Sequence, residues 1–142
     1  MSDRVFVDTN VFVYADDASA KTKRPRARQV LSELIRDRRA VVSTQVMQEY
    51  YVAAIKKLGL APEKARTRVE RLQRLDTVVI RPDMIVAAID LHRLHSLSFW
   101  DALVVKAASV AGCGRLLSED LSEGQLIDGV RIVNPFSRVR PD

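Results

Sequence analysis

Short apolar runs alternate along the chain with longer amphipathic stretches. Runs rich in β-branched residues predict five strands, at about 5–7, 40–42, 77–80, 115–117 and 130–133. Apolar residues recur at helical spacing in the intervals and predict helices, at about 25–38, 44–58, 62–75, 84–95 and 98–111. Strands that alternate with helices favour a three-layer α/β/α sandwich around a mostly parallel sheet of about five strands.

Local residues define the ends of several of these elements. Pro25 and Pro62 can each occupy the first position of a helix, and Ser43 or Thr44 can cap the helix that follows the second strand. Residues 11–14 continue the first apolar run, as a turn or a short helix, and the segment from Pro135 onward is predicted to be a tail. No linker or repeat interrupts the pattern, so residues 1–142 are predicted to form a single domain.

The composition narrows the class of protein. Of the 142 residues, 47% are hydrophobic and 29% are charged, which is typical of a globular domain and excludes general disorder. No apolar run approaches the roughly 20 residues that a membrane helix needs, and Met1–Arg4 lead directly into a strand without a signal peptide. The single cysteine, Cys113, fits a reducing cytoplasm.

Four acidic residues from distant parts of the chain are expected at one edge of this sheet. They are Asp8 and Asp120, which follow the first and fourth strands, Glu49 in the helix after the second strand, and Asp101 in the first turn of another helix. The carboxyl ends of parallel strands and the starts of the following helices meet at the same edge. Clustered carboxylates repel one another unless a cation lies between them, and their oxygens select Mg²⁺ or Mn²⁺.

Each acid also has a structural interpretation. Asp101 follows Ser98 by three residues, as in a capping box, and Asp8 or Asp120 could belong to turns. Glu49 could be a solvated helix residue. The shared edge favours the functional interpretation, although either Glu119 or Asp120 could face the crevice.

The remaining charge favours a polyanionic partner. The chain carries 23 Lys and Arg residues against 18 Asp and Glu residues, a net charge of +5. Lys21, Lys23 and Arg24 lie in the loop region that follows the Asp8 strand, and they are the best candidates for contacts with RNA phosphates. Trp100, beside Asp101, could pack on the core or lie in a dimer interface.

The motifs around the acids resemble those of a known family. Val5-Phe6-Val7-Asp8-Thr9-Asn10-Val11 resembles the opening motif of PIN-domain ribonucleases. Phe99-Trp100-Asp101-Ala102-Leu103 and Leu117-Ser118-Glu119-Asp120-Leu121 resemble the motifs of the third and fourth acids in PIN toxins of the VapC type. Glu49 matches the helical glutamate of that family, and the resemblance covers essentially the whole chain.

The resemblance implies a metal-dependent endoribonuclease, the toxin of a toxin–antitoxin pair, that forms a homodimer and binds a cognate antitoxin protein. Asp8, Glu49, Asp101 and Asp120 would then hold one or two Mg²⁺ or Mn²⁺ ions, with Asp8 and Asp101 as direct ligands. Glu49 would hold or orient the attacking water, and Asp120 would act through water or a second ion. Thr9, Asn10 and Ser118 would donate hydrogen bonds that fix the carboxylates.

Two other functions are also compatible with the sequence. A phosphatase-like Mg²⁺ enzyme would use Asp8 as a nucleophile, but it usually has a second aspartate two residues on, where this chain has Asn10. A non-catalytic RNA- or protein-binding module with a vestigial acidic site is the other alternative.

Overall fold

A computed structural model describes residues 3–139, so Met1, Ser2 and residues 140–142 of the predicted domain lie outside the described residues. The chain forms a six-stranded sheet with strand order β3-β2-β1-β4-β6-β5. The strands are β1 (Val5–Val7), β2 (Ala40–Ser43), β3 (Asp76–Val78), β4 (Arg115–Leu117), β5 (Leu126–Ile127) and β6 (Val130–Val133). All strand pairs are parallel except β5 with β6.

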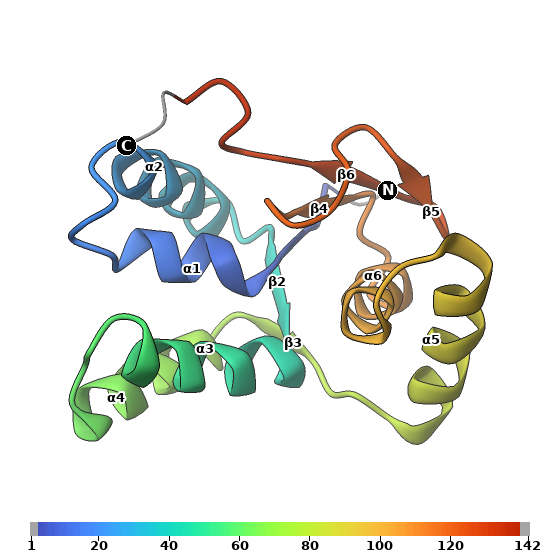
Figure 1. Ribbon diagram of the computed structural model, residues 1–142, viewed down its shortest axis with the longest axis horizontal. Coiled ribbons are helices and arrows are strands. Elements are labelled where there is room, and N and C mark those ends of the chain that lie inside the picture. Colours follow the sequence, from blue (N-terminus) through green and yellow to red (C-terminus); the bar gives the residue numbers. More distant parts are fainter. Residues whose placement is uncertain (1–2, 140–142) are drawn as a thin grey trace.

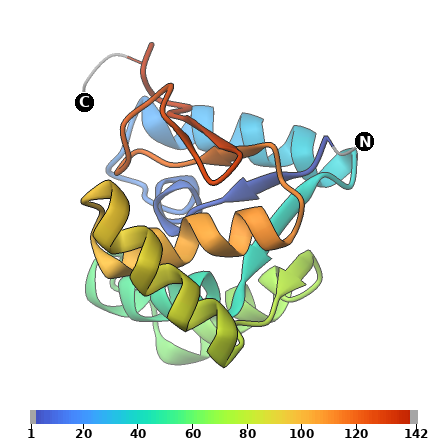
Figure 2. The ribbon, with the colours of Figure 1, turned by 90° about the vertical axis from the view of Figure 1, so that its right-hand side faces the viewer.

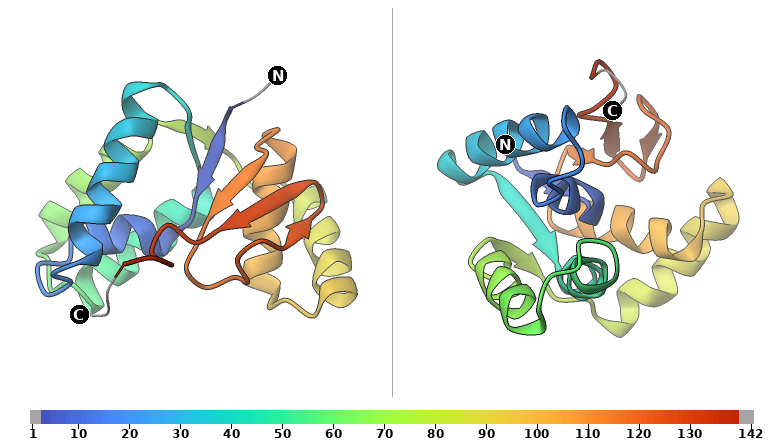
Figure 3. Two further views of the ribbon diagram at one scale, coloured as in Figure 1. Left: turned by 90° about the horizontal axis from the view of Figure 1, so that it is seen from above. Right: turned by 60° about the vertical axis from the view of Figure 1, so that its left-hand side comes forward.

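Six helices within residues 3–139 cover the sheet. They are α1 (Thr9–Ala15), α2 (Lys23–Arg36), α3 (Thr44–Lys56), α4 (Pro62–Leu72), α5 (Pro82–His95) and α6 (Phe99–Val110). Figure 1 and the left view of Figure 3 show α1–α4 on one side of the sheet and α5 and α6 on the other. Helix α6 packs on the sheet, and α5 packs on the outer side of α6, as Figure 2 shows. The predicted three-layer α/β/α arrangement is therefore confirmed.

The core lies on both faces of the central strands. Phe6 of β1 pairs with Val41 of β2 on one side and with Leu116 of β4 on the other, and all three side chains are buried. Such a strand is apolar at every position because helices cover both faces of a parallel sheet. Helix α6 is also apolar on nearly all sides, because it lies between the sheet and α5, and its residues Val105 and Ala108 are fully buried.

The structure corrects the expected elements, most clearly at both ends of α2 and by an additional strand; α3 and α4 also end two to three residues earlier, α5 begins two residues earlier, and β3 is shifted toward the N-terminus. Helix α2 begins at Lys23 rather than Pro25, because a proline is tolerated throughout the first turn, where the N–H groups have no helical partner. The same helix ends at Arg36, and Arg38 adopts a left-handed conformation with φ of 57°. A sixth strand, β5, forms a hairpin with β6 through Asp128 and Gly129, both of which have positive φ.

The expectation that the chain forms a tail from Pro135 onward is wrong for the described part of this segment, which ends at Val139. Phe136 is buried, and its ring meets Tyr14 of α1 edge-on with 5.0 Å between ring centroids. No helix within residues 3–139 is both long enough and apolar enough to span a membrane.

Candidate acidic site

Asp8 lies at the centre of the candidate site. It follows β1 and caps α1, and its Oδ1 accepts a hydrogen bond from the backbone N–H of Thr9 at 2.8 Å. Its Oδ2 accepts one from the Ser118 hydroxyl, also at 2.8 Å. Burial raises the pKa of Asp8 to about 7; the hydrogen bonds from Ser118 and Thr9 oppose this shift, whereas the charges of Glu49 and Asp120 add to it.

Asn10 connects the ends of β1 and β4. Its Nδ2 atom lies 3.1 Å from Oδ2 of Asp120 and 3.4 Å from Oδ2 of Asp8. Its Oδ1 accepts a hydrogen bond from the backbone N–H of Glu119 at 3.2 Å. Ser118 completes the link, because its Oγ also accepts a hydrogen bond from the backbone N–H of Asp120. Two segments more than 100 residues apart are thus held in register by amide and hydroxyl groups.

Helix α3 brings Glu49 to this edge. Ser43 caps the helix by accepting a hydrogen bond from Val46 N–H, and Glu49 follows one and a half turns later. The Thr9 hydroxyl donates to Oε1 of Glu49 at 2.7 Å, and Gln45 Nε2 donates to Oε2 at 3.1 Å. Glu49 is therefore fixed beside Asp8 rather than exposed on a solvated face.

Asp101 approaches from the start of α6. Its backbone N–H donates to the side chain of Ser98, so the predicted capping interaction forms. Burial raises the pKa of its carboxyl, the Ser98 hydroxyl lowers it, and the charges of Asp120 and Glu49 raise it further. The capping and functional interpretations are compatible, because the cap uses the backbone N–H of Asp101 while its carboxyl still interacts with the charges of Asp120 and Glu49.

Glu119 is directed away from these acids. Its Oε1 accepts a hydrogen bond from the Tyr14 hydroxyl at 2.7 Å, and its Oε2 forms an ion pair with Lys23 Nζ at 2.6 Å. Burial raises the pKa of Glu119, but the hydrogen bonds from Lys23 and Tyr14 outweigh it and leave the pKa lowered. Asp120, bound by Asn10, is the acid that faces Asp8.

The donor set fits a hard divalent cation in its chemistry. All four groups are carboxylates, and none of them takes part in an ion pair with a Lys or Arg among the described residues. Burial is the main cause of the raised pKa of Asp8 and Asp101, and repulsion from neighbouring acids adds to it; a cation would offset both costs of ionising these carboxyls. Within residues 3–139, however, no three His, Cys, Asp or Glu side chains are already grouped closely enough to hold a metal ion. The carboxylates would have to move together on binding.

The sequence profile of the PIN domain matches residues 5–122, which include all four acids. The chain belongs to the PIN domain family. Comparison with curated protein sequences gives no significant match.

Solved structures share the fold of this PIN domain. A toxin–antitoxin complex from Klebsiella pneumoniae contains a chain that is 23% identical, with a TM-score of 0.67 over 92% of this chain and 97% of that one. DNA-bound VapBC from Salmonella typhimurium is 21% identical, with a TM-score of 0.67 over 93% and 97% of the two chains. VapC20 of Mycobacterium tuberculosis, described as a toxin that cleaves the sarcin–ricin loop, is 17% identical, with a TM-score of 0.59 over 79% and 86%.

The PIN domain has a small cleft beside the acids. It has a volume of about 290 Å³ and is lined by residues that include Asn10, Glu49, Lys57, Glu119 and Asp120. Lys57 was not singled out from the sequence, since it lies among many other basic residues. Gln45 was also missed, although its position one turn before Glu49 places both on one helix face. Its Oε1 is buried and has no hydrogen-bond partner among the described residues.

The three basic candidates of the PIN domain differ in their surroundings. Lys21 is exposed, whereas Lys23 is engaged with Glu119 and lies 4.9 Å from the centroid of the Tyr14 ring. Arg24 is partly buried, and its Nε has no hydrogen-bond partner among the residues described. A role for any of them in RNA binding stays a prediction.

Proposed function

We propose that this PIN domain is a Mg²⁺- or Mn²⁺-dependent endoribonuclease, the toxin of a toxin–antitoxin pair. One observation carries the proposal: four carboxylates from distant segments influence one another's charge at a single sheet edge. Among the described residues, no Lys or Arg forms an ion pair with any of the four. That arrangement costs stability in a purely structural protein, and a bound divalent cation removes the cost.

The residues of this chain would divide the work. Asp8 and Asp101 would hold the cation, which when bound lowers the pKa of water and offsets charge on the phosphate in the transition state. Glu49 would hold the attacking water, and Asp120 would act through water or a second ion. Thr9, Ser118 and Asn10 would fix the carboxylates through the hydrogen bonds described above.

The proposed substrate is RNA, and the charge of the chain supports it. A net charge of +5 favours a polyanion, and Lys21, Lys23 and Arg24 would contact its phosphates. Lys57 lines the cleft with Glu49 and Asp120, where a cationic side chain can attract a phosphate toward the acids.

The proposed partners are an antitoxin protein and a second copy of the chain. Similar folds occur in toxin–antitoxin complexes, which supports an antitoxin that covers the acidic cleft with a basic side chain or an amphipathic segment. A homodimer remains an expectation from the family resemblance. The protein would act in the cytoplasm, where its RNA substrate is found.

Cleavage of RNA by the purified protein tests the proposal. We expect single-stranded RNA to be cut with Mg²⁺ or Mn²⁺, and cutting to stop with EDTA or in Asp8→Asn. Asp83→Asn is the matched control, because Asp83 is an exposed carboxylate in the first turn of α5 that pairs with Arg81, the residue before the helix. Equal cleavage by wild type and Asp8→Asn would refute the proposal.

One observation favours the alternative of a non-catalytic binding module. The described side chains do not form a ready-made group of three metal ligands. Calorimetric titration with Mn²⁺ separates the two functions, since a vestigial site would bind the ion weakly or not at all and a nuclease would bind it in a manner that requires Asp8.

A further inference from the structure

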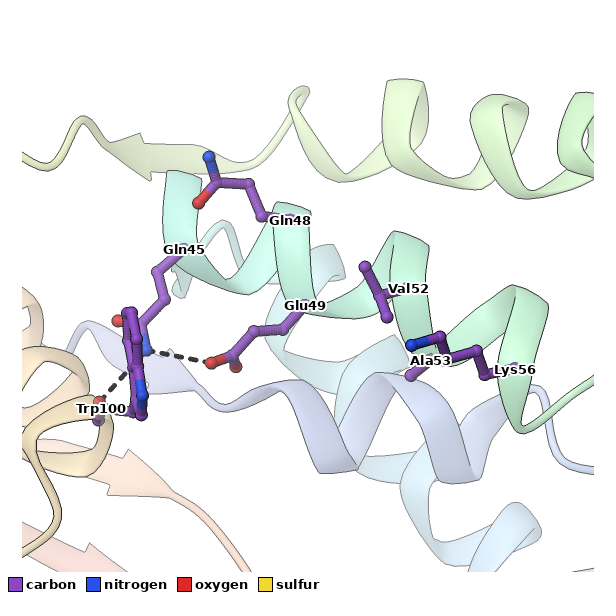
Figure 4. Close-up of a pocket in the computed structure, with 7 residues that line it drawn as sticks. All are labelled: Gln45, Gln48, Glu49, Val52, Ala53, Lys56 and Trp100. Atoms are coloured by element: carbon purple, nitrogen blue, oxygen red, sulfur yellow. Dashed lines mark hydrogen bonds between the residues drawn. The ribbon is translucent and has the colours of Figure 1, made fainter.

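A second groove adjoins the acidic cleft and is different in character. Figure 4 shows it along α3, with the ring of Trp100 at one end and Lys56 toward the other. It has a volume of about 490 Å³, and its walls include Val52, Ala53 and Glu49. Glu49 and Ala53 line both this groove and the acidic cleft, so the two spaces lie next to each other at these residues.

Trp100 lines the groove with most of its side chain exposed, which is unusual for a tryptophan. It directly precedes Asp101, and 62% of its surface is exposed, so the expectation that it could pack on the core is wrong. Its backbone carbonyl accepts a hydrogen bond from Gln45 Nε2 at 3.1 Å, and its ring meets Phe99 edge-on at 5.1 Å. These contacts hold the residue near α3, and in Figure 4 the ring is seen edge-on with Glu49 and Val52 beside one face.

The chemistry of this groove fits an unpaired nucleobase. A flat aromatic face beside an apolar wall stacks any base, because every base has a π-face. Single-stranded RNA is commonly recognised in this way, with its bases turned out of the helix onto aromatic side chains. Lys56 supplies a cation at the far end, where it can offset the charge of a neighbouring phosphate.

We propose that the groove binds one unpaired base of the RNA strand, stacked on the Trp100 indole, while an adjacent phosphodiester lies at the acids. The inference rests on the proposed function for its substrate and adds a specificity: the enzyme requires an unpaired nucleotide next to the cleavage site. Trp100 is a substrate-binding residue in this arrangement, and it takes no part in metal binding.

The sequence offers a direct readout, because Trp100 is the only tryptophan in the chain. Asp8→Asn protein in EDTA is titrated with a fluorescein-labelled, single-stranded oligouridylate, and with an abasic oligonucleotide of equal length. RNA anisotropy reports binding, and in a parallel titration with unlabelled RNA the tryptophan emission reports stacking. We expect the base-containing RNA to quench Trp100 and the abasic strand to leave its emission unchanged.

Substitutions then test how much stacking on Trp100 contributes to RNA affinity. Trp100→Leu should weaken binding of the base-containing RNA about 10-fold, the size expected for one lost stack, and leave binding of the abasic strand unchanged. Trp100→Phe should recover part of the loss. Leu94→Ala, at another exposed apolar side chain, is the control and should have no effect.

Three results would overturn the inference. They are RNA binding without a change in Trp100 emission, equal RNA affinity of Trp100→Leu and the parent protein, and an emission shift that depends on protein concentration alone. The last result would assign the groove to a second copy of the chain. Cleavage by the wild type is measured separately. Cleavage that does not depend on Trp100 would overturn only this inference, whereas base stacking without any cleavage would overturn only the proposed nuclease function.

Discussion

The amide nitrogen of Asn10 lies 3.1 Å from a carboxylate oxygen of Asp120, across 110 residues of sequence. The same side chain accepts a hydrogen bond from Glu119 N–H, so both ends of the amide are used. An asparagine, which has a donor and an acceptor, satisfies this position, and an aspartate would place a fifth negative charge there.

Asn10→Ala should therefore weaken Mn²⁺ binding by about 10- to 100-fold, the usual effect of losing a group that orients a metal ligand. Asn10→Asp should keep the contact with Glu119 N–H but repel Asp120. Isothermal titration calorimetry measures both, with Gln73→Ala as the control amide on the exposed end of α4. Unchanged affinity in Asn10→Ala would show that Asp120 needs no support from Asn10.

Asp8 should make the metal-free protein less stable as the pH rises. Its pKa is about 7 in the folded protein against 3.8 for an aspartate in the unfolded chain, so between these pH values the folded state binds the extra proton. Stability from this group is complete below pH 3.8 and is lost as the pH rises through 7, by at most about 4 kcal/mol.

Urea unfolding in EDTA between pH 5 and 8 checks this expectation. Wild type should lose stability over the range, Asp8→Asn should lose much less, and Mn²⁺ should restore the wild type at pH 8. Parallel curves for the two proteins would mean that neither burial nor neighbouring charge destabilises the ionised Asp8 carboxylate in the folded state.

The edge at which the acids meet could be predicted from the sequence because it follows from topology. Once Val5–Val7 and Arg115–Leu117 are parallel neighbours, Asp8 and Asp120 must leave the sheet at the same end. The choice between Glu119 and Asp120 could not be made in this way. It depends on Tyr14 and Lys23, which contact Glu119 only when α1 and α2 pack beside the segment that follows β4.

Very short elements could not be predicted from the sequence either. Strand β5 has two residues, too few for an alternating pattern, and its only local signal was the Asp128-Gly129 dipeptide typical of a tight hairpin. The burial of Phe136 had no local signal at all, because it depends on the Tyr14 ring more than 120 residues earlier.

The Lys23–Glu119 ion pair should limit what Lys23 contributes to RNA binding. Its ammonium is held at 2.6 Å from Glu119, and both side chains are about one-quarter exposed. A phosphate must compete with that carboxylate, so Lys23→Met should change RNA affinity little in the wild type and more in Glu119→Gln.

Binding of labelled RNA to the Asp8→Asn form of each protein, at several salt concentrations, tests this double-mutant cycle. Releasing Lys23 in Glu119→Gln should steepen the salt dependence by about one phosphate contact. Lys21→Met, at an exposed lysine, is the comparison. Additive effects of Lys23→Met and Glu119→Gln would indicate that the pair does not restrain the lysine.

Phe136 should be a major contributor to stability, although it lies near the end of the chain. The side chain is 4% exposed, packs edge-on against Tyr14 and lies with its ring centroid 6.0 Å from Lys23 Nζ. Phe136→Ala should lower the free energy of unfolding by about 3–5 kcal/mol, as for other buried phenylalanines. Tyr51→Ala, at an aromatic residue that is 38% exposed, should cost much less.

Because Tyr14 also donates a hydrogen bond to Glu119, the Phe136 variant should disturb the loop that carries Asp120. Urea unfolding and Mn²⁺ titration of the same samples separate the two effects, and a loss below about 1 kcal/mol would mean that the final segment is not part of the core.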